Sequence, residues 1–259
     1  MSSVAKKKAL VCGASAGIGQ AVARALAKQD VHVILLARRG EMLRTLCDEL
    51  NHLKPDSASI LIADLDNRDD LIEKVNVALQ SGPIHILINN TGGPPAGPIL
   101  TAKEIDFSMA FGRHVLASHR LVQTVLPGMQ ASQFGRIINI ISTSVREPIP
   151  NLGVSNTIRG AMASWAKSLA RELPPNITIN NVLPGFTDTQ RLHSLKTAIA
   201  QKNKISLEDV HTNWLSQVPE GRLASPNETA AAVVFLASQS AGYIRGVSLP
   251  VDGGRMRSI

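Results

Sequence analysis

The stretch CGASAGIGQ, residues 12–20, decides the fold because it joins an apolar run to an alanine-rich helical pattern. Glycine permits a positive φ and lets the backbone approach a phosphate with no Cβ in between. The helix that follows offers unpaired N–H groups and the positive end of its dipole. A strand, a glycine turn and a helix in this order predict a pyrophosphate site, although the spacing Gly-x3-Gly-x-Gly is a variant of the usual G-x-G-x-x-G. The residues expected to hold the pyrophosphate are Gly13, Ser15, Gly17, Ile18 and Gly19.

Outward from this turn, short apolar runs alternate with amphipathic stretches. Strands are predicted at Ala9–Cys12, Val31–Leu36, Ser59–Ile62, Ile84–Ile88, Arg136–Ile141, Thr178–Val182 and Val247–Val251. Helices are predicted at Ile18–Lys28, Glu41–Leu53, Arg68–Gln80, Ala102–Leu126, Val154–Leu173 and Asn227–Ser238. This alternation predicts an α/β fold, a doubly wound parallel sheet of about seven strands with helices on both faces. Pro127 is expected to end the long middle helix, and Pro174 the next one.

The composition agrees with one α/β domain over residues 1–259. The chain is 44% hydrophobic but only 3% aromatic, so its core must be built from Leu, Ile, Val and Ala. Such a core suits a parallel sheet covered on both faces. No linker or internal repeat divides the chain. The polar segment 190–217 interrupts the alternation, and we expect it to form a lid or substrate loop.

The net charge, the apolar runs and the cysteine content limit the binding partners and the cellular location that we expect. The net charge is +7, but the 27 basic residues are scattered and aromatic residues for base stacking are scarce, which argues against a nucleic-acid partner. No apolar run approaches the ~18 residues of a membrane span, and the N-terminus lacks the apolar segment of a signal peptide. Cys12 and Cys47 cannot form a disulfide framework. We expect a cytoplasmic protein with no membrane, nucleic-acid or metal partner.

The end of the second predicted strand indicates which dinucleotide is bound. An NAD site usually places Asp or Glu about 20 residues after the glycine turn, where it holds the ribose 2′-hydroxyl. This strand ends instead in Arg38-Arg39, with no carboxylate. Arginine pairs well with a phosphate, so NADP(H) is favoured over NAD(H). A solvated basic loop is the alternative, but it does not account for the missing acid.

Over nearly its whole length the chain resembles the short-chain dehydrogenase/reductase family, of which the 3-oxoacyl-acyl-carrier-protein reductases are members. The glycine turn matches the family's TGxxxGxG, with Cys12 in place of the threonine. Further matching segments are Asp64-Leu65, Asn89-Asn90-Thr91-Gly92, Gly135–Ser142, Pro184-Gly185 followed by Thr187 and Thr189, and Val251–Gly254. The resemblance implies that these segments bind the cofactor, with Asp64 and Leu65 at the adenine and Pro184-Gly185 beside the nicotinamide.

The resemblance also implies four catalytic positions, three of which differ from the family's residues. Ser142 stands where the family has its serine. Ser155 stands in place of the tyrosine, Arg159 in place of the lysine, and His114 in place of the asparagine. The only tyrosine, Tyr243, lies near the C-terminus.

These replacements change the acid–base chemistry. A phenol has a pKa of about 10, and an aliphatic hydroxyl is far less acidic. Arg159 stays charged and can hold the nicotinamide ribose or a substrate anion, but it cannot shuttle a proton. His114 has a pKa suited to proton transfer, although a structural hydrogen bond explains it equally well. Ser144, Arg113 and Arg146 are expected near the cleft, where the arginines would recognise an anion or remain surface residues.

Three functions remain open. The first is an NADP-dependent oxidoreductase acting on a carbonyl or alcohol, such as a 3-oxoacyl thioester, with the proton supplied by His114 or by water held at Ser142, Ser155 and Arg159. The second is a non-catalytic dinucleotide-binding sensor or partner subunit. The third is a dehydration or isomerisation in which the cofactor is only structural. The resemblance further implies a homodimer or homotetramer formed through the helices Ala102–Leu126 and Val154–Leu173.

Overall fold

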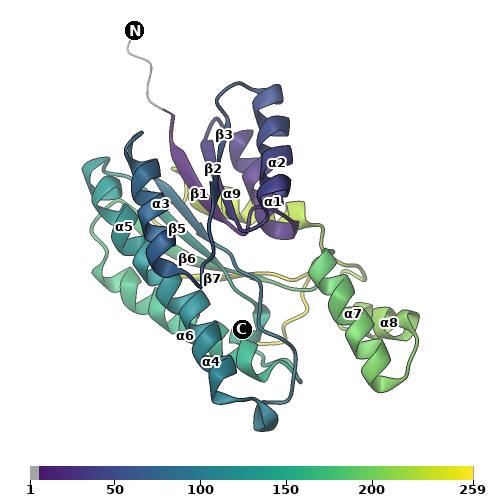
Figure 1. Cartoon of the computed structure of the whole chain (residues 1–259). Coiled ribbons are helices and arrows are strands. Elements are labelled where there is room, and N and C mark those ends of the chain that lie inside the picture. The colour runs from purple at the N-terminus through teal and green to yellow at the C-terminus, as the bar shows by residue number, and fades with distance from the viewer. Residues whose placement is uncertain (1–5, 259) are drawn as a thin grey trace.

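The computed structural model describes residues 6–258, and its seven strands form one parallel sheet (Figure 1). The strands are β1 (Lys8–Cys12), β2 (His32–Ala37), β3 (Ala58–Ile62), β4 (Ile86–Asn89), β5 (Gly135–Ile140), β6 (Ile177–Pro184) and β7 (Ser248–Val251). Their order across the sheet is β3-β2-β1-β4-β5-β6-β7. The doubly wound fold predicted from the sequence is therefore confirmed, with strand ends shifted by a few residues.

Helices cover both faces of this sheet. They are α1 (Gly17–Ala27), α2 (Gly40–Leu53), α3 (Arg68–Leu79), α4 (Glu104–Phe111), α5 (Ala117–Ala131), α6 (Gly153–Glu172), α7 (Gln190–Asn203), α8 (Leu207–Leu215) and α9 (Pro226–Ala237). Buried side chains of α1, α2 and α9 share one apolar cluster with one side of the sheet. Those of α3, α5 and α6 share a second cluster with the other side. Among residues 6–258, no helix combines the length and the apolarity that a membrane span requires.

Aliphatic residues predominate in the central strands and explain why these strands form. All four residues of β4 and all eight of β6 are buried, as expected for strands covered on both faces. The edge strand β3 differs, since Ile60 and Ile62 are each 37% exposed. From β1 the sheet continues through β2 and β3 in one direction, and from β4 it continues through β5, β6 and β7 in the other. The strand order therefore reverses between β1 and β4, and folds of this kind bind ligands in the crevice at that position.

The prediction that Pro127 ends the middle helix is wrong, because α5 continues to Ala131 with the proline inside it. A proline removes the hydrogen bond to the carbonyl four residues earlier, here that of Gln123. Both Pro127 and Gln123 are exposed, so water can satisfy that carbonyl. Val125 and Met129 on the opposite side are fully buried, and this packing holds the helix on both sides of the proline.

The middle helix also begins later than predicted and is interrupted. A short 3₁₀ turn, Ile99–Thr101, precedes α4, and a π-helical turn, Gly112–Leu116, joins α4 to α5. In that turn the N–H of Ala117 donates to the carbonyl of Gly112, five residues earlier. This turn carries His114 and Arg113.

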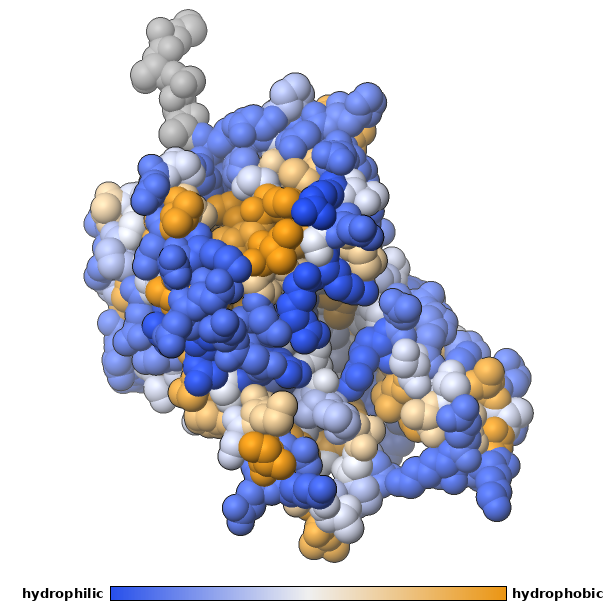
Figure 2. All heavy atoms as spheres, viewed as in Figure 1, coloured by the Kyte–Doolittle hydropathy of each residue, from blue (hydrophilic) through white to orange (hydrophobic). Residues whose placement is uncertain are grey.

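The polar segment 190–217 forms two helices, α7 and α8, which project from one side of the sheet body in Figure 1. Thr189 and Ser206 cap their N-termini. A small apolar cluster of Ala200, Val210 and Trp214 holds the two helices together. Figure 2 shows a hollow in the surface between these helices and the sheet body.

A ladder of side-chain hydrogen bonds links the four neighbouring strands β4, β5, β6 and β7. Asn89 donates to Asn139 at 2.8 Å, Asn139 to Asn181 at 2.9 Å, and Asn181 to the hydroxyl of Ser248 at 3.0 Å. These residues are in register on β4, β5, β6 and β7. Because the amides are buried, their mutual hydrogen bonds favour one alignment of the strand ends that carry the candidate site.

Candidate active site

The carboxyl ends of β1 to β6 open into a cleft of about 710 Å³. Its wall includes most of the residues predicted from the sequence. Those that line it are Gly13, Ser15, Gly17, Ile18, Arg38, Arg39, Asp64, Leu65, Asn90, Thr91, Gly92, Ser142, Ser155, Arg159, Pro184, Gly185, Thr187 and Thr189. Gly19 and His114 do not line it.

The glycine turn needs its glycines for two different reasons. Gly13 and Gly17 have φ of +64° and +57°, a region that residues with a Cβ adopt rarely. Gly19 has ordinary backbone angles, but a Cβ there would meet the carbonyl oxygen of Gly13 and, at 2.6 Å, the amide nitrogen of Asn90. Gly19 therefore lets α1 pack against the turn and does not face the cleft.

The first turn of α1 is open to an anion. No side chain caps this helix, and its first turn has no acidic residue. Its leading N–H groups and dipole are thus available to a phosphate. At the end of β2, the Arg39 guanidinium donates to the hydroxyl of Ser15 at 2.9 Å, and Arg38 lies 3.5 Å from the carboxylate of Asp64. The Arg38 side chain is 68% exposed, so this ion pair is weak and the guanidinium can turn to a ligand.

These features fit a dinucleotide with an additional phosphate on the adenosine ribose. The uncapped helix would hold the pyrophosphate, and Arg38 with Arg39 would face the extra phosphate. Among the described residues no cluster of three or more His, Cys, Asp or Glu side chains could hold a metal ion. Cys12 and Cys47 are both free, and burial raises the pKa of the Cys12 thiol to about 12.

Ser142 and Ser155 reach the cleft from two elements. Ser142 follows β5 and caps a 3₁₀ turn, Thr143–Val145, where its hydroxyl accepts a hydrogen bond from the N–H of Ser144 at 3.1 Å. Ser155 stands in the first turn of α6, one helical turn before Arg159. Both hydroxyls can donate a hydrogen bond to a ligand oxygen.

Arg159 reaches across the ends of two strands. Its guanidinium donates to the carbonyl of Ile140 at 3.0 Å and to that of Thr91 at 3.3 Å. Burial, and then the nearby charge of Arg191, lower its pKa to about 10, so it remains a cation at pH 7. It therefore supplies a fixed positive charge to the cleft and no proton.

His114 is 1% exposed and lies behind the wall of the cleft. Burial, and then the charges of Arg159 and Arg113, lower its pKa to about 3. Among residues 6–258, neither ring nitrogen has a hydrogen-bond partner of normal geometry. The nearby backbone of Gly92 raises the pKa slightly and does not offset the effect of burial. The imidazole is accordingly neutral at physiological pH.

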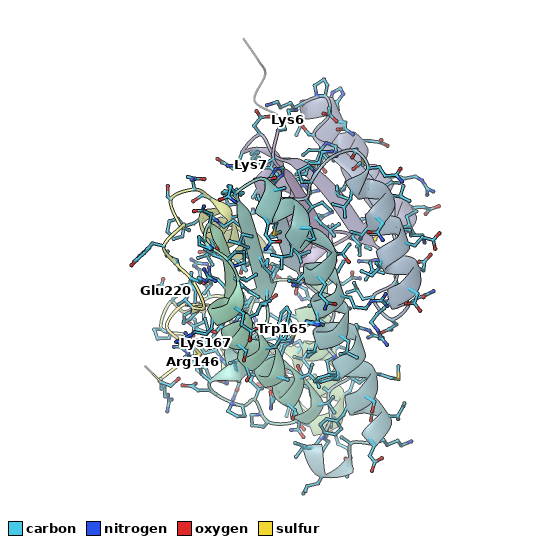
Figure 3. All side chains as sticks on the ribbon, turned by 90° about the vertical axis from the view of Figure 1, so that its left-hand side faces the viewer. Lys6, Lys7, Arg146, Trp165, Lys167 and Glu220 are labelled. Atoms are coloured by element: carbon cyan, nitrogen blue, oxygen red, sulfur yellow. The ribbon has the colours of Figure 1, made fainter. Side chains whose placement is uncertain are left out.

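Of the other residues expected near the cleft, one lines it and two do not. Arg113 lines it and donates to the carboxylate of Asp66 at 2.9 Å. Ser144 is buried outside the lining. Arg146 is exposed and donates to the carbonyl of Ser248 at 3.1 Å, and Figure 3 shows it near Lys167 at the β7 side of the molecule. Tyr243 is fully exposed.

Several residues that line the cleft were not singled out by the residue patterns, among them Gly93 and Arg191. Arg191 stands in the first turn of α7 and donates to the carbonyls of Pro94 at 2.9 Å and Gly93 at 3.4 Å. It falls inside the predicted lid segment, but nothing in the local pattern distinguishes it from a surface arginine. Its position two residues after Thr189 was the available signal.

Comparisons with known proteins place this architecture in a family. The model of a family described as enoyl-(acyl carrier protein) reductase matches residues 13–255. The chain is 31% identical to the NADPH-dependent reductase BacG of Bacillus subtilis, over 99% of this chain and all of that protein. It is 35% identical to the 3-oxoacyl-[acyl-carrier-protein] reductase FabG of Vibrio cholerae, over 96% of each.

Solved structures of reductases have the same fold. The L-sorbose reductase of Gluconobacter frateurii, complexed with NADPH and L-sorbose, superposes with a TM-score of 0.91 at 28% identity, covering 99% of this chain and 98% of that one. This chain belongs to the short-chain dehydrogenase/reductase family.

Proposed function

We propose that this chain is an NADPH-dependent reductase that delivers hydride to an electron-poor carbon of a carbonyl compound. The observation that carries the proposal is the combination of an uncapped α1 with Arg38 and Arg39 directly after β2, in the place where an NAD site has an acidic residue for the ribose 2′-hydroxyl. Relatives described as NADPH-dependent reductases support the same cofactor.

The bound cofactor supplies two electrons as a hydride, and the chain must accommodate the negative charge that develops on the substrate oxygen. The hydroxyl of Ser142 would donate a hydrogen bond to that oxygen, and the fixed charge of Arg159 would stabilise it electrostatically. The proton that completes an alcohol would come from water in the cleft, because Arg159 keeps its proton and His114 is neutral and lies behind the wall.

Purified protein should bind NADPH and oxidise it in the presence of a substrate from a panel of ketones, 3-oxoacyl thioesters and keto sugars. The loss of nicotinamide absorbance reports turnover, and product analysis reports the reduced carbonyl. We expect Ser142→Ala to lower kcat about 100-fold, the usual effect of removing one donor to a developing oxyanion. Ser168→Ala, an exposed serine on α6, is the matched control.

Two outcomes would contradict the proposal. Failure to bind NADPH would remove its basis. Tight NADPH binding with no oxidation across the panel would instead favour a sensor or partner subunit without turnover.

We also propose that the protein assembles as a homodimer or homotetramer through the α4–α5 and α6 helices. Exposed apolar side chains on this side support the proposal, among them Ile105 at 57% and Met109 at 53% exposure. Light scattering of the purified chain tests it, and a monomer at micromolar concentration would contradict it.

A further inference from the structure

Arg159 is a buried cation with no counter-charge. Its side chain is 8% exposed, and its hydrogen bonds go only to the backbone carbonyls of Ile140 and Thr91. Among residues 6–258, no carboxylate oxygen lies within 4.0 Å of its guanidinium. Burying a charge without an opposite partner is unfavourable, so this arrangement is best explained by a ligand that brings a negative charge.

A second cation approaches the same place. Arg191 comes from α7 on the other side of the cleft, and its Nη2 is held by the carbonyls of Pro94 and Gly93. It too has no carboxylate within 4.0 Å in the part of the chain that the structure describes. Its charge contributes to the lowered pKa of Arg159, as expected for two like charges held near one another. An anion between them would relieve that repulsion.

The two guanidinium groups converge on a definable point beside Gly93. A Cβ on this residue would have as its three nearest atoms Nη2 of Arg159 at 3.7 Å, Nη2 of Arg191 at 3.8 Å and Oγ of Ser155 at 3.8 Å. The three donors therefore surround the open face of this glycine, and each of them can donate a hydrogen bond to an anion seated against that face. Two guanidinium groups and a hydroxyl around one anion suit the acceptor oxygens of a carboxylate.

We infer that the point between Arg159, Arg191 and Ser155, beside Gly93, binds the carboxylate of the substrate, and that the substrates are oxo acids. The inference rests on the proposed reductase function and specifies its substrate class. The phosphates of the cofactor already have partners in the glycine turn, the first turn of α1 and Arg38. The Gly93 point lies instead beside the Ser155 hydroxyl, in the same cleft as Ser142, at which the reacting carbonyl is expected. Binding of a cofactor phosphate by Arg191 is the alternative that the experiment must detect.

Matched pairs of acids and esters test the inference by kinetics. Turnover of 2-oxobutanoate, 3-oxobutanoate and 4-oxopentanoate is compared with turnover of their methyl esters, which keep the carbonyl and lose the charge. We expect kcat/KM for at least one acid to exceed that of its ester about 30- to 100-fold, the usual value of a charge-assisted pair. Arg191→Gln should bring the acid down to the level of its ester.

Gly93→Ala probes the point itself. The φ of Gly93 lies outside the left-handed region, so the backbone accepts alanine, and the new methyl group projects between the three donors, where it obstructs an anion. We expect KM for the acid to rise at least tenfold. Gly160→Ala is the matched control, because this glycine lies one residue from Arg159 on α6 and a Cβ there meets nothing within 4 Å.

A binding measurement separates this inference from the proposed function. The three acids and their esters are titrated calorimetrically into the protein alone and into the protein saturated with NADP⁺, with no turnover required. We expect an acid to bind, its ester not to bind, and the acid to be lost in Arg191→Gln and Gly93→Ala, while NADPH affinity changes less than about twofold. Equal binding of acid and ester, or weakened NADPH binding in Arg191→Gln, would overturn the carboxylate site. Acid binding with no NADPH binding or no turnover would instead count against the reductase function alone.

Discussion

Arg38 has the clearest separable role among the single residues. Its guanidinium is mostly exposed and paired only with Asp64, at 3.5 Å across solvent. A phosphate on the adenosine ribose would be a stronger partner than this exposed carboxylate, because three oxygens and a larger charge face the planar guanidinium.

Arg38→Ala should therefore weaken NADPH binding about 10- to 100-fold, the value of a charge-assisted hydrogen bond, and leave NADH binding nearly unchanged. Fluorescence titration with each dinucleotide measures both constants. Arg44→Ala, an exposed arginine on α2, is the control. Equal losses for NADPH and NADH would show that Arg38 supports the fold of the loop and not the phosphate.

His114 predicts a pH dependence of stability. In the folded chain its pKa is lowered to about 3 by burial, whereas an exposed imidazole titrates near 6.5. Between these two pH values His114 is therefore protonated in the unfolded chain and neutral in the folded chain. The free energy of unfolding falls as pH drops from about 6.5 towards 3.

His114→Asn should remove this contribution, so that the variant loses about 3 kcal/mol less stability than the parent between pH 7 and pH 4. Urea unfolding at several pH values measures it. Acidic groups with lowered pKa values, such as Glu228 at about 2, lose stability in both proteins and cancel in the comparison. Parallel curves for parent and variant would contradict the assignment.

Sequence reasoning reached most residues of the cleft because most of them follow a strand, and strand ends in a parallel sheet meet at one edge. Ser155 and Arg159, which lie on α6, were reached through the family resemblance. It did not reach Arg191 or the point beside Gly93. Their meeting depends on how α7 folds back over the cleft, and on the absence of one Cβ, neither of which a local pattern encodes. Nor did the sequence show that His114 lies behind the wall, since burial depends on the π turn that carries it.

At the scale of elements, the same capping box occurs twice in very different surroundings. Ser225 and Glu228 cap α9, and Ser206 and Asp209 cap α8. The buried side of α9 belongs to the apolar cluster shared with α1 and the sheet, whereas α8 packs in the small cluster with α7 and Phe186, which follows β6.

Ser225→Ala should cost about 1 kcal/mol of global stability and lower Tm by about 2–4 °C, because α9 unfolds with the sheet. Ser206→Ala removes the same kind of cap but should leave Tm within 1 °C, roughly, since local opening of α7–α8 does not require the sheet to unfold. Scanning calorimetry compares the two. Equal shifts would mean that α8 is part of the cooperative core.

The errors in the predicted elements have physical causes of the same kind. Proline propensity correctly indicates a lost hydrogen bond at Pro127, but the exposed Gln123 carbonyl makes that loss inexpensive, and buried neighbours outweigh it. The segment 190–217 is weakly helical by composition, yet caps at Thr189 and Ser206 and the stacking of Trp214 on Phe186, with ring centres 5.1 Å apart, order it. Caps and distant aromatic contacts are weak signals in a single sequence.

For the molecule as a whole, the cleft is bounded by the sheet body on one side and by α7–α8 on the other. Arg191 and Thr189 tie the start of α7 to the cleft wall, since Arg191 donates to the carbonyl of Pro94 and a Cβ on Gly17 would lie 3.3 Å from the Thr189 side chain. A dinucleotide in the cleft would contact both sides.

We therefore expect NADPH to slow tryptic cleavage at Lys202 and Lys204, which are exposed at the end of α7, at least threefold by closing this segment on the body. Cleavage after the exposed Lys28, which follows α1, should not change. Mass spectrometry of timed digests identifies each site. Equal protection at all three would indicate general stabilisation, and no protection would show that α7–α8 is not a lid.

The π turn at Gly112–Leu116 holds one residue more than an α-helical turn would. Because each residue of an α-helix turns the chain by about 100°, deletion of a single residue here would rotate α4 by that angle while α5 stayed on the sheet. Ala110, which now packs on α6 with Val154 and Ile158, would leave that contact, and Met109 or Ile105 would change the direction it faces. An insertion or deletion of one codon at this turn is thus a route by which related chains can acquire a different outer surface, and with it different assembly partners, without altering the sheet or its cofactor cleft.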